Sequence, residues 1–181
     1  MIVLDLKGQG EKLTFYGPPD PDAPKLDFEC TIAAGATGPD PHSHPRQTET
    51  FRITEGRMRA VVDGEEREIG AGETLVVSPG QVHTFSNPDP VHPVTMKITI
   101  EPALHFQWFM TEAARSAIRG GGRWKDASLL ETCWIMNQVA DEHDYPGIPH
   151  WLKRPMFGTL ATLAVVMRKT RRVEPLVRGR G

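Results

Sequence analysis

The stretch over residues 41–49, Pro-His-Ser-His-Pro-Arg-Gln-Thr-Glu, restricts the fold and chemistry of this chain more than any other. His42 and His44 are separated by one residue, so an extended backbone turns both imidazoles to the same face. Glu49, five residues after His44, can join them. Imidazole and carboxylate groups together suit a divalent transition metal. Taken alone, the pair of histidines fits an exposed loop as well as it fits a metal site.

A fourth candidate ligand lies far along the chain, at His83, after a short apolar run that is typical of a strand. Glu49 has the same strand parity as Phe51 and Ile53, which places its carboxylate on an apolar, inward face. A carboxylate in such surroundings costs free energy unless it is paired or bound to a cation. The three histidines and Glu49 are therefore predicted to share one metal ion.

These two stretches resemble the two sequence motifs of the cupin family, over roughly residues 25 to 101. The first motif, Gly-x5-His-x-His-x(3–4)-Glu-x6-Gly, is matched by His42, His44, Glu49 and Gly56. The second, Gly-x5-Pro-x-Gly-x2-His-x3-Asn, is matched by Gly72, Gly80, His83 and Asn87. Ala36 replaces the opening glycine of the first motif, and Ser78 replaces the proline of the second. Both departures concern the backbone of turns and leave the ligand positions intact.

The resemblance implies a mostly β fold, a cupin-type jelly-roll barrel, with one divalent transition metal inside it. The implied ligands are His42, His44, Glu49 and His83. Fe, Mn, Ni, Co, Cu and Zn all accept nitrogen and oxygen ligands, so the sequence leaves the metal open. The predicted substrate pocket consists of Gln47, Phe51, Ile53 and Phe85. No other cofactor is indicated, because no glycine loop leads from a strand into a helix to cradle a phosphate.

Alternation of apolar and polar residues predicts many short strands between glycine and proline turns. The predicted strands cover residues 2–6, 12–16, 25–32, 57–62, 65–69, 74–77, 82–85 and 94–100, besides the segment after Glu49. Asp63-Gly64 is a strong hairpin signal. Cys30 falls on the apolar face of its strand, so it is interpreted as a core residue rather than a reactive thiol.

Beyond residue 102 the period of the apolar residues changes from 2 to 3.6. Helices are predicted over residues 111–119, 126–140 and 155–169, with Thr111 and Asp126 as caps and Pro155 in a first turn. We therefore expect residues 1–104 to form the cupin barrel. Residues 105–181 should form a helical extension packed on the barrel or on a partner subunit.

Composition excludes several partners and indicates others. The formal charge of −2 gives no reason to expect a nucleic-acid or membrane partner. Two cysteines are too few for a disulfide framework, and the first residues do not form a signal peptide, so a cytoplasmic location is expected. A homodimer is expected because cupins commonly pair through sheet edges. The apolar third helix and the tryptophans also exceed what a small barrel can cover; these are Trp108, Trp124, Trp134 and Trp151.

Four further histidines, His92, His105, His143 and His150, lack ligand spacing and are interpreted as surface or packing residues. The first functional hypothesis is a metal-dependent oxygenase, in particular a dioxygenase, acting on a small organic molecule. Glu49 would then be a ligand and also a catalytic proton acceptor. Two alternatives remain open at this stage: a non-catalytic module that binds or senses a small ligand, and a metal-dependent isomerase or lyase.

Overall fold

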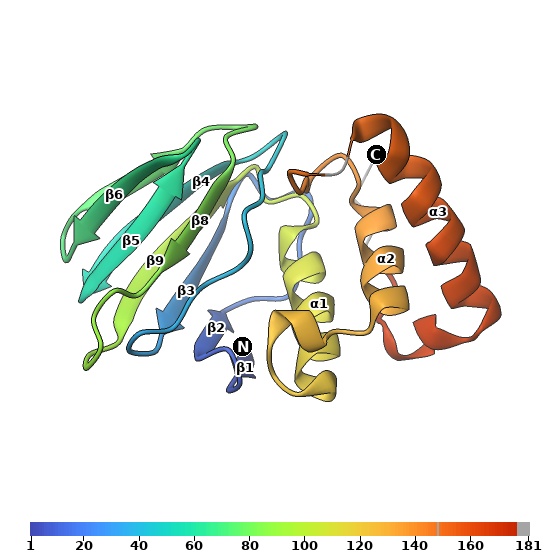
Figure 1. Ribbon diagram of the computed structural model, residues 1–181, viewed down its shortest axis with the longest axis horizontal. Coiled ribbons are helices and arrows are strands. Elements are labelled where there is room, and N and C mark those ends of the chain that lie inside the picture. The colour runs from blue at the N-terminus through green and yellow to red at the C-terminus, as the bar shows by residue number, and fades with distance from the viewer. Residues whose placement is uncertain (148, 177–181) are drawn as a thin grey trace.

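Two antiparallel sheets carry the first hundred residues in the computed structural model, which describes residues 1–147 and 149–176 (Figure 1). The larger sheet has the order β1-β2-β3-β9-β4-β7, and the smaller has the order β6-β5-β8. The strands are β1 Ile2–Leu6, β2 Glu11–Phe15, β3 Leu26–Ile32, β4 Thr48–Glu55, β5 Arg57–Val62, β6 Glu65–Gly70, β7 Thr74–Val77, β8 His83–Ser86 and β9 Val94–Glu101. Their inner faces share one core, as the facing sheets of a jelly roll do.

The predicted alternation holds strand by strand. In β9 the side chains of Val94, Met96, Ile98 and Ile100 are all buried, while Lys97 between them is exposed. In β4 the buried positions are Glu49, Phe51 and Ile53, as their shared parity predicts. Cys30 is fully buried in β3, and burial raises the pKa of its thiol well above the ordinary value. Cys30 is therefore a core residue, as predicted.

The hairpin between β5 and β6 also follows from local sequence. Asp63 and Gly64 both have positive φ, 51° and 85°, as a type I′ turn requires. Val62 and Glu65 pair directly across this two-residue turn. Gly56, between β4 and β5, has φ 78°, and a Cβ there would lie 2.6 Å from the carbonyl oxygen of Pro93. Only glycine fits that turn without a shift of the backbone.

The helices lie together on one side of the sheets, with α1 nearest to them and α3 farthest away (Figure 1). Their bounds are α1 Phe106–Gly120, α2 Leu129–Gln138 and α3 His150–Val166, with 3₁₀ turns at Trp124–Asp126 and Lys169–Arg172. Phe106 of α1 joins the core of the sheets, and its ring centroid lies 5.7 Å from that of Phe28. The predicted class, mostly β with a C-terminal helical extension, is confirmed.

The predicted helix starts were wrong by three to five residues. Thr111 lies within α1 rather than at its start, because Glu142 accepts hydrogen bonds from the backbone N–H and the Nδ1 of His105, just before the helix, at 2.9 and 2.6 Å. Asp126 does not cap α2; its carboxylate pairs with Arg123 instead. Pro155 lies inside α3, not in its first turn. These ends depend on tertiary partners and not on the local capping signals.

The structure also bears on the expectations about a membrane partner and about the cysteines. No helix among residues 1–147 and 149–176 is long and apolar enough to span a membrane. Both cysteines are free and buried. The division at residue 104 stays a prediction, although the last strand ends at Glu101 and α1 begins at Phe106. The C-terminal arginines at positions 178 and 180 lie outside the described residues.

Candidate metal centre

The segment that carries His42 and His44 is held between β8 and the helical extension. On one side, the backbones of His42 and His83 exchange two hydrogen bonds, of 3.0 and 2.8 Å. On the other side, the backbones of Ser43 and Asp144 exchange two more, of 2.8 and 2.9 Å. Residues 42–44 therefore act as a short strand with a partner on each edge, which explains why the two imidazoles share a face.

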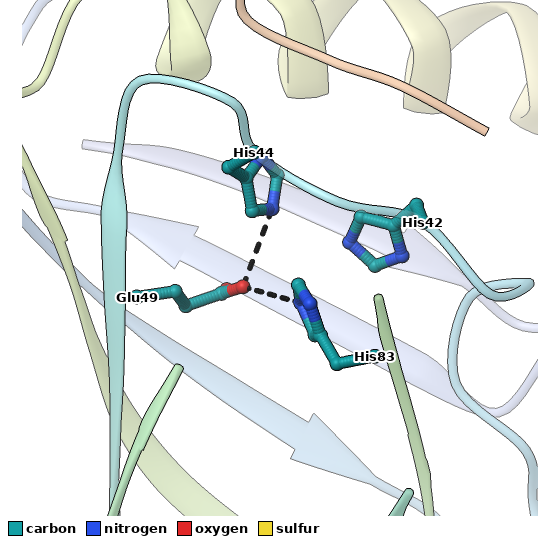
Figure 2. A group of neighbouring side chains, drawn as sticks. All are labelled: His42, His44, Glu49 and His83. Carbon is teal, nitrogen blue, oxygen red and sulfur yellow. Dashed lines mark hydrogen bonds and ion pairs between the residues drawn. The ribbon is translucent and has the colours of Figure 1, made fainter. Parts of the chain in front are cut away.

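Four side chains converge at this point (Figure 2). One ligand atom from each of His42, His44, Glu49 and His83 lies within 4.8 Å of the others, and all four residues are buried. His83 Nε2 is 2.8 Å from Glu49 Oε2, and His44 Nε2 is 3.3 Å from the same oxygen. The structure thus brings together the four ligands that the sequence predicts, from the 42–44 segment, β4 and β8.

The environment of the ring nitrogens fits a metal ligand set. Nδ1 of His42 faces the carbonyl oxygen of Asp40 at 2.9 Å, and Nδ1 of His83 faces that of Gln81 at 3.2 Å. A ring that donates its Nδ1–H in this way presents the lone pair of Nε2 to the centre. Nε2 of His44 has only the 3.3 Å contact with Glu49 Oε2, and Nδ1 of His44 is buried without a hydrogen bond to any described residue. A metal ion would satisfy the nitrogen of His44 that otherwise carries a desolvation cost.

Electrostatics couple the four groups. Burial alone would raise the pKa of Glu49, but its hydrogen bonds with His44 and His83 outweigh burial and lower that pKa. Burial would lower the pKa of His83, but the bond to Glu49 and its charge raise it above the ordinary value. Burial, with the nearby charges of His83 and His44, lowers the pKa of His42 to about 3. The 2.8 Å contact between Glu49 and His83 therefore favours the charged form of both groups.

The raised pKa of His83 predicts how metal affinity depends on pH. His83 must lose its proton before Nε2 can bind a metal, so protons compete with the metal below that pKa. We expect the affinity for a divalent metal to fall at least about tenfold between pH 7.5 and pH 5.5, since each competing proton costs up to about tenfold per pH unit. A chelator competition titration at both pH values measures this fall. An affinity that is the same at both pH values would contradict the prediction.

The extension adds an imidazole that the sequence analysis did not assign to the site. The pairing of Ser43 with Asp144 places the neighbouring side chains on the opposite face, so His143 and Tyr145 face the ligand histidines. The ring centroid of His143 lies 4.4 Å from that of His44 and 5.2 Å from that of His42. His143 is 5% exposed, which fits the packing alternative of the predicted surface or packing role and also places the residue beside the candidate ligands. No signal in the local sequence could have found it, because a hundred residues separate it from His42.

A cavity of about 310 Å³ opens between the larger sheet and the helices, beside the four ligands. Its lining includes His42 and Glu49 of the ligand cluster, and His143 and Tyr145 of the extension. Most of the remaining lining is apolar and comes from both parts of the chain; it includes Leu13, Phe28, Ile98, Phe106, Phe109, Met110 and Ile135. Pockets of this size and polarity hold small organic ligands. The helical extension therefore supplies one wall of the cavity.

The four residues predicted to form the substrate pocket occupy different places. Phe85 lines the cavity. Phe51 and Ile53 are each 1% exposed and lie in the core on the same face as Glu49, outside the cavity lining. Gln47 is also buried, and its amide nitrogen donates hydrogen bonds to the carbonyl oxygens of Ala103 at 3.0 Å and Pro102 at 3.2 Å. In this conformation Gln47 ties the metal-binding segment to the end of β9 rather than facing the cavity.

Comparisons with known proteins found one matching family model and several similar solved structures. The family model of the cupin domain matches residues 28–100. Among solved structures, a Streptomyces nucleoside dehydratase is 21% identical over 55% of this chain and 75% of its own, with a TM-score of 0.45. A sugar phosphate isomerase from Silicibacter pomeroyi is 21% identical over 51% and 59%, with a TM-score of 0.45. A recombinant oxalate oxidase is 23% identical over 51% of each chain, with a TM-score of 0.44. The comparison with curated proteins gave no match.

The fold and the site define a protein of two facing β-sheets whose interior presents three imidazoles and one carboxylate that could hold a metal ion. Residues 28–100 match the cupin domain, the family that the two motifs of the sequence resemble. All four candidate ligands lie within the matched residues. His143 and the rest of the helical extension lie outside them, so the wall that closes the cavity is additional to the cupin domain.

Proposed function

We propose that His42, His44, Glu49 and His83 hold one divalent transition metal, and that the protein is a metal-dependent oxygenase acting on a small, largely apolar organic molecule. The observation that carries the proposal is the convergence of four buried ligands at the wall of a ligand-sized cavity. The absence of cysteine from this set argues against a closed structural zinc site. When bound, such a metal would polarise an oxygen of the substrate or activate dioxygen.

The residues around the metal centre are proposed to bind the substrate, exclude water and hydrogen-bond the reacting group. The apolar lining from β3, β9 and α1 excludes water and binds the body of the substrate. His143 lies against His42 and His44 and lines the cavity. We therefore propose His143 as the side chain that hydrogen-bonds the reacting end of the substrate. Glu49 acts as a ligand and as a proton acceptor, although its contacts with His44 and His83 lower its pKa.

Turnover separates the oxygenase from its alternatives. The metal-loaded protein is supplied with enols, phenols, diketones and keto acids, while oxygen consumption and product mass are followed. Oxygen-dependent product that disappears in the His83→Ala protein supports the oxygenase. Product formed equally without oxygen would support the isomerase or lyase. A molecule that binds the loaded protein tightly yet emerges unchanged, with and without oxygen, would establish a binding or sensing module instead.

Replacing His143 by leucine is expected to lower kcat/KM about 100-fold, the size of effect that follows loss of one positioned hydrogen-bonding group at the reacting atoms. The metal content should stay at the wild-type level, because His143 is not among the four convergent ligands. The exposed His92 provides a matched control, and His92→Leu should leave both quantities unchanged. Loss of metal from the His143→Leu protein would show that His143 supports the metal centre rather than the substrate.

We also propose that the chain forms a homodimer, and that it functions in the cytoplasm. Support for the dimer comes from α3 and the residue after it, where large apolar side chains are exposed; these are Trp151, Leu152, Leu163, Val165, Val166 and Met167. The two free, buried cysteines fit a reducing compartment. Light scattering at tens of micromolar should give twice the chain mass, and Trp151→Glu with Val166→Glu should shift it to the monomer. A monomer mass for the wild-type protein rejects the dimer.

A further inference from the structure

Glu11 is a second carboxyl group in the wall of the cavity, separate from the metal centre. It begins β2 and is only 2% exposed. Across the larger sheet, β2 is separated from β4, which carries Glu49, by three strand spacings, roughly 14 Å. The side chains of Leu13, Phe28 and Ile98 line the cavity on the sheet between them. Besides the exposed Asp40, the cavity thus has buried carboxyl groups in two places and an apolar surface between them.

The two oxygens of Glu11 differ in their partners. Oε2 accepts a hydrogen bond of 2.7 Å from Nε1–H of Trp124. Oε1 has only the weak thiol donor of Cys30, whose Sγ lies 4.0 Å away. Within the described residues, no basic side chain pairs with Glu11. Burial raises its pKa to about 7, although the bond from Trp124 partly offsets this effect. A buried carboxyl group with one weakly satisfied oxygen is costly unless a donor completes it.

A purely structural role does not account for this arrangement. Anchoring the 3₁₀ turn at Trp124–Asp126 to the sheet requires one hydrogen-bond acceptor, which an uncharged amide would supply without the cost of burying an ionisable group. Oε1 can accept a further hydrogen bond, and Glu11 lies in the wall of a cavity that is lined mostly by apolar side chains. Lys125 also lines the cavity but forms no ion pair with Glu11, so a ligand can supply the strong donor that Oε1 lacks.

We propose that the cavity binds an elongated molecule with an apolar body, an oxygen-bearing group at the metal end, and an amine or hydroxyl at the other end that donates a hydrogen bond to Glu11. The metal end of this inference rests on the proposed function, whereas the Glu11 end does not. Glu11 lies outside residues 28–100, so this subsite is a feature of the present chain and not of the matched cupin domain.

The Glu11 end is tested first on metal-free protein. Linear primary amines and the corresponding alcohols, four to eight carbons long, are titrated calorimetrically against wild type, Glu11→Gln and Trp124→Phe. Wild type should bind the amine at least about tenfold more tightly than the alcohol of equal length, since hydrogen bonds to charged groups are the stronger ones. Glu11→Gln keeps the acceptor for Trp124 and should lose this preference, whereas Trp124→Phe should retain it.

The full length of the site is tested on protein loaded with Mn²⁺. The probes are linear carboxylic acids of four to twelve carbons that end in a methyl, hydroxyl or amino group. At one chain length, the carboxylic acids that end in a hydroxyl or amino group should bind at least about tenfold more tightly than the acid that ends in a methyl group. Glu11→Gln should abolish this difference. An amine preference without metal, combined with failure of wild type to load metal, would reject the proposed function but keep the Glu11 subsite.

Three results would overturn the inference. The first is the absence of any amine or hydroxyl preference at every chain length, with and without metal. The second is a preference that survives in Glu11→Gln. The third is an equal loss in Glu11→Gln and Trp124→Phe, which would mean that both residues only maintain the shape of the wall. Metal content measured on every variant keeps these outcomes separate from failure of the metal centre.

Discussion

The His83→Ala protein is expected to bind divalent metal at least about 100-fold more weakly than wild type. Loss of a residue that only supports a ligand already costs about 10- to 100-fold, and His83 is one of four direct ligand candidates. The substitution also leaves Glu49 with His44 as its single imidazole partner at 3.3 Å. His44→Ala should have an effect of similar size. Metal content by mass spectrometry and affinity by chelator competition measure both variants.

The control for this experiment is His92→Ala, which removes an imidazole that is 75% exposed and is not one of the four candidate ligands. It should bind metal as wild type does, at about one ion per chain. Circular dichroism on the metal-free proteins separates loss of ligands from loss of the fold. A wild-type protein that stays metal-free after reconstitution with Fe, Mn, Ni, Co, Cu and Zn would reject the metal centre altogether.

The Glu11→Gln protein is expected to be more stable than wild type at pH 8 but not at pH 4. The pKa of Glu11 is about 7 in the folded protein, above its ordinary value of 4.5. The folded state therefore favours the protonated carboxyl, and the stability present below the unfolded pKa is lost as the pH rises from about 4.5 to 7. That loss is about 3 kcal/mol when each pH unit of pKa difference contributes about 1.4 kcal/mol.

Glutamine avoids this loss because it does not ionise, and its side-chain oxygen can still accept the hydrogen bond from Trp124. Urea unfolding of the metal-free proteins at pH 4 and pH 8 measures the difference. Glu55→Gln, at an exposed position of β4, should change stability little at either pH. If Glu11→Gln and wild type differ by the same amount at both pH values, folding does not raise the pKa of Glu11, and the prediction is wrong.

Local sequence predicted the four candidate ligands and the strands that carry them. Glu49 and His83 are placed inward by strand parity, and that parity depends only on the backbone geometry of consecutive residues. The Asp63-Gly64 turn was predicted for the same kind of reason, because positive φ at both positions is set by residue type. Such features need no knowledge of distant contacts, and the structure reproduces them.

The helix ends and the walls of the cavity could not be derived in this way. α1 begins at Phe106 because Glu142 binds the backbone of His105, and the two residues are far apart along the chain. His143 joins the site because Asp144 pairs with Ser43, and Glu11 joins the cavity because Trp124 packs against β2. The members of each pair are far apart along the chain, so neither hydrophobic periodicity nor a turn motif in the sequence predicts that they meet.

The sequence by itself determined which groups could bind a metal and which face of each strand they occupy, because those properties follow from residue type and strand period. The tertiary structure decided what surrounds that metal centre. It placed an imidazole from the extension against the ligands and a second carboxyl group in the same cavity. The physical reason is that burial, which raises the pKa of Glu11, and the contacts between buried groups, which shift the pKa values of Glu49 and His83, arise only when distant segments pack together.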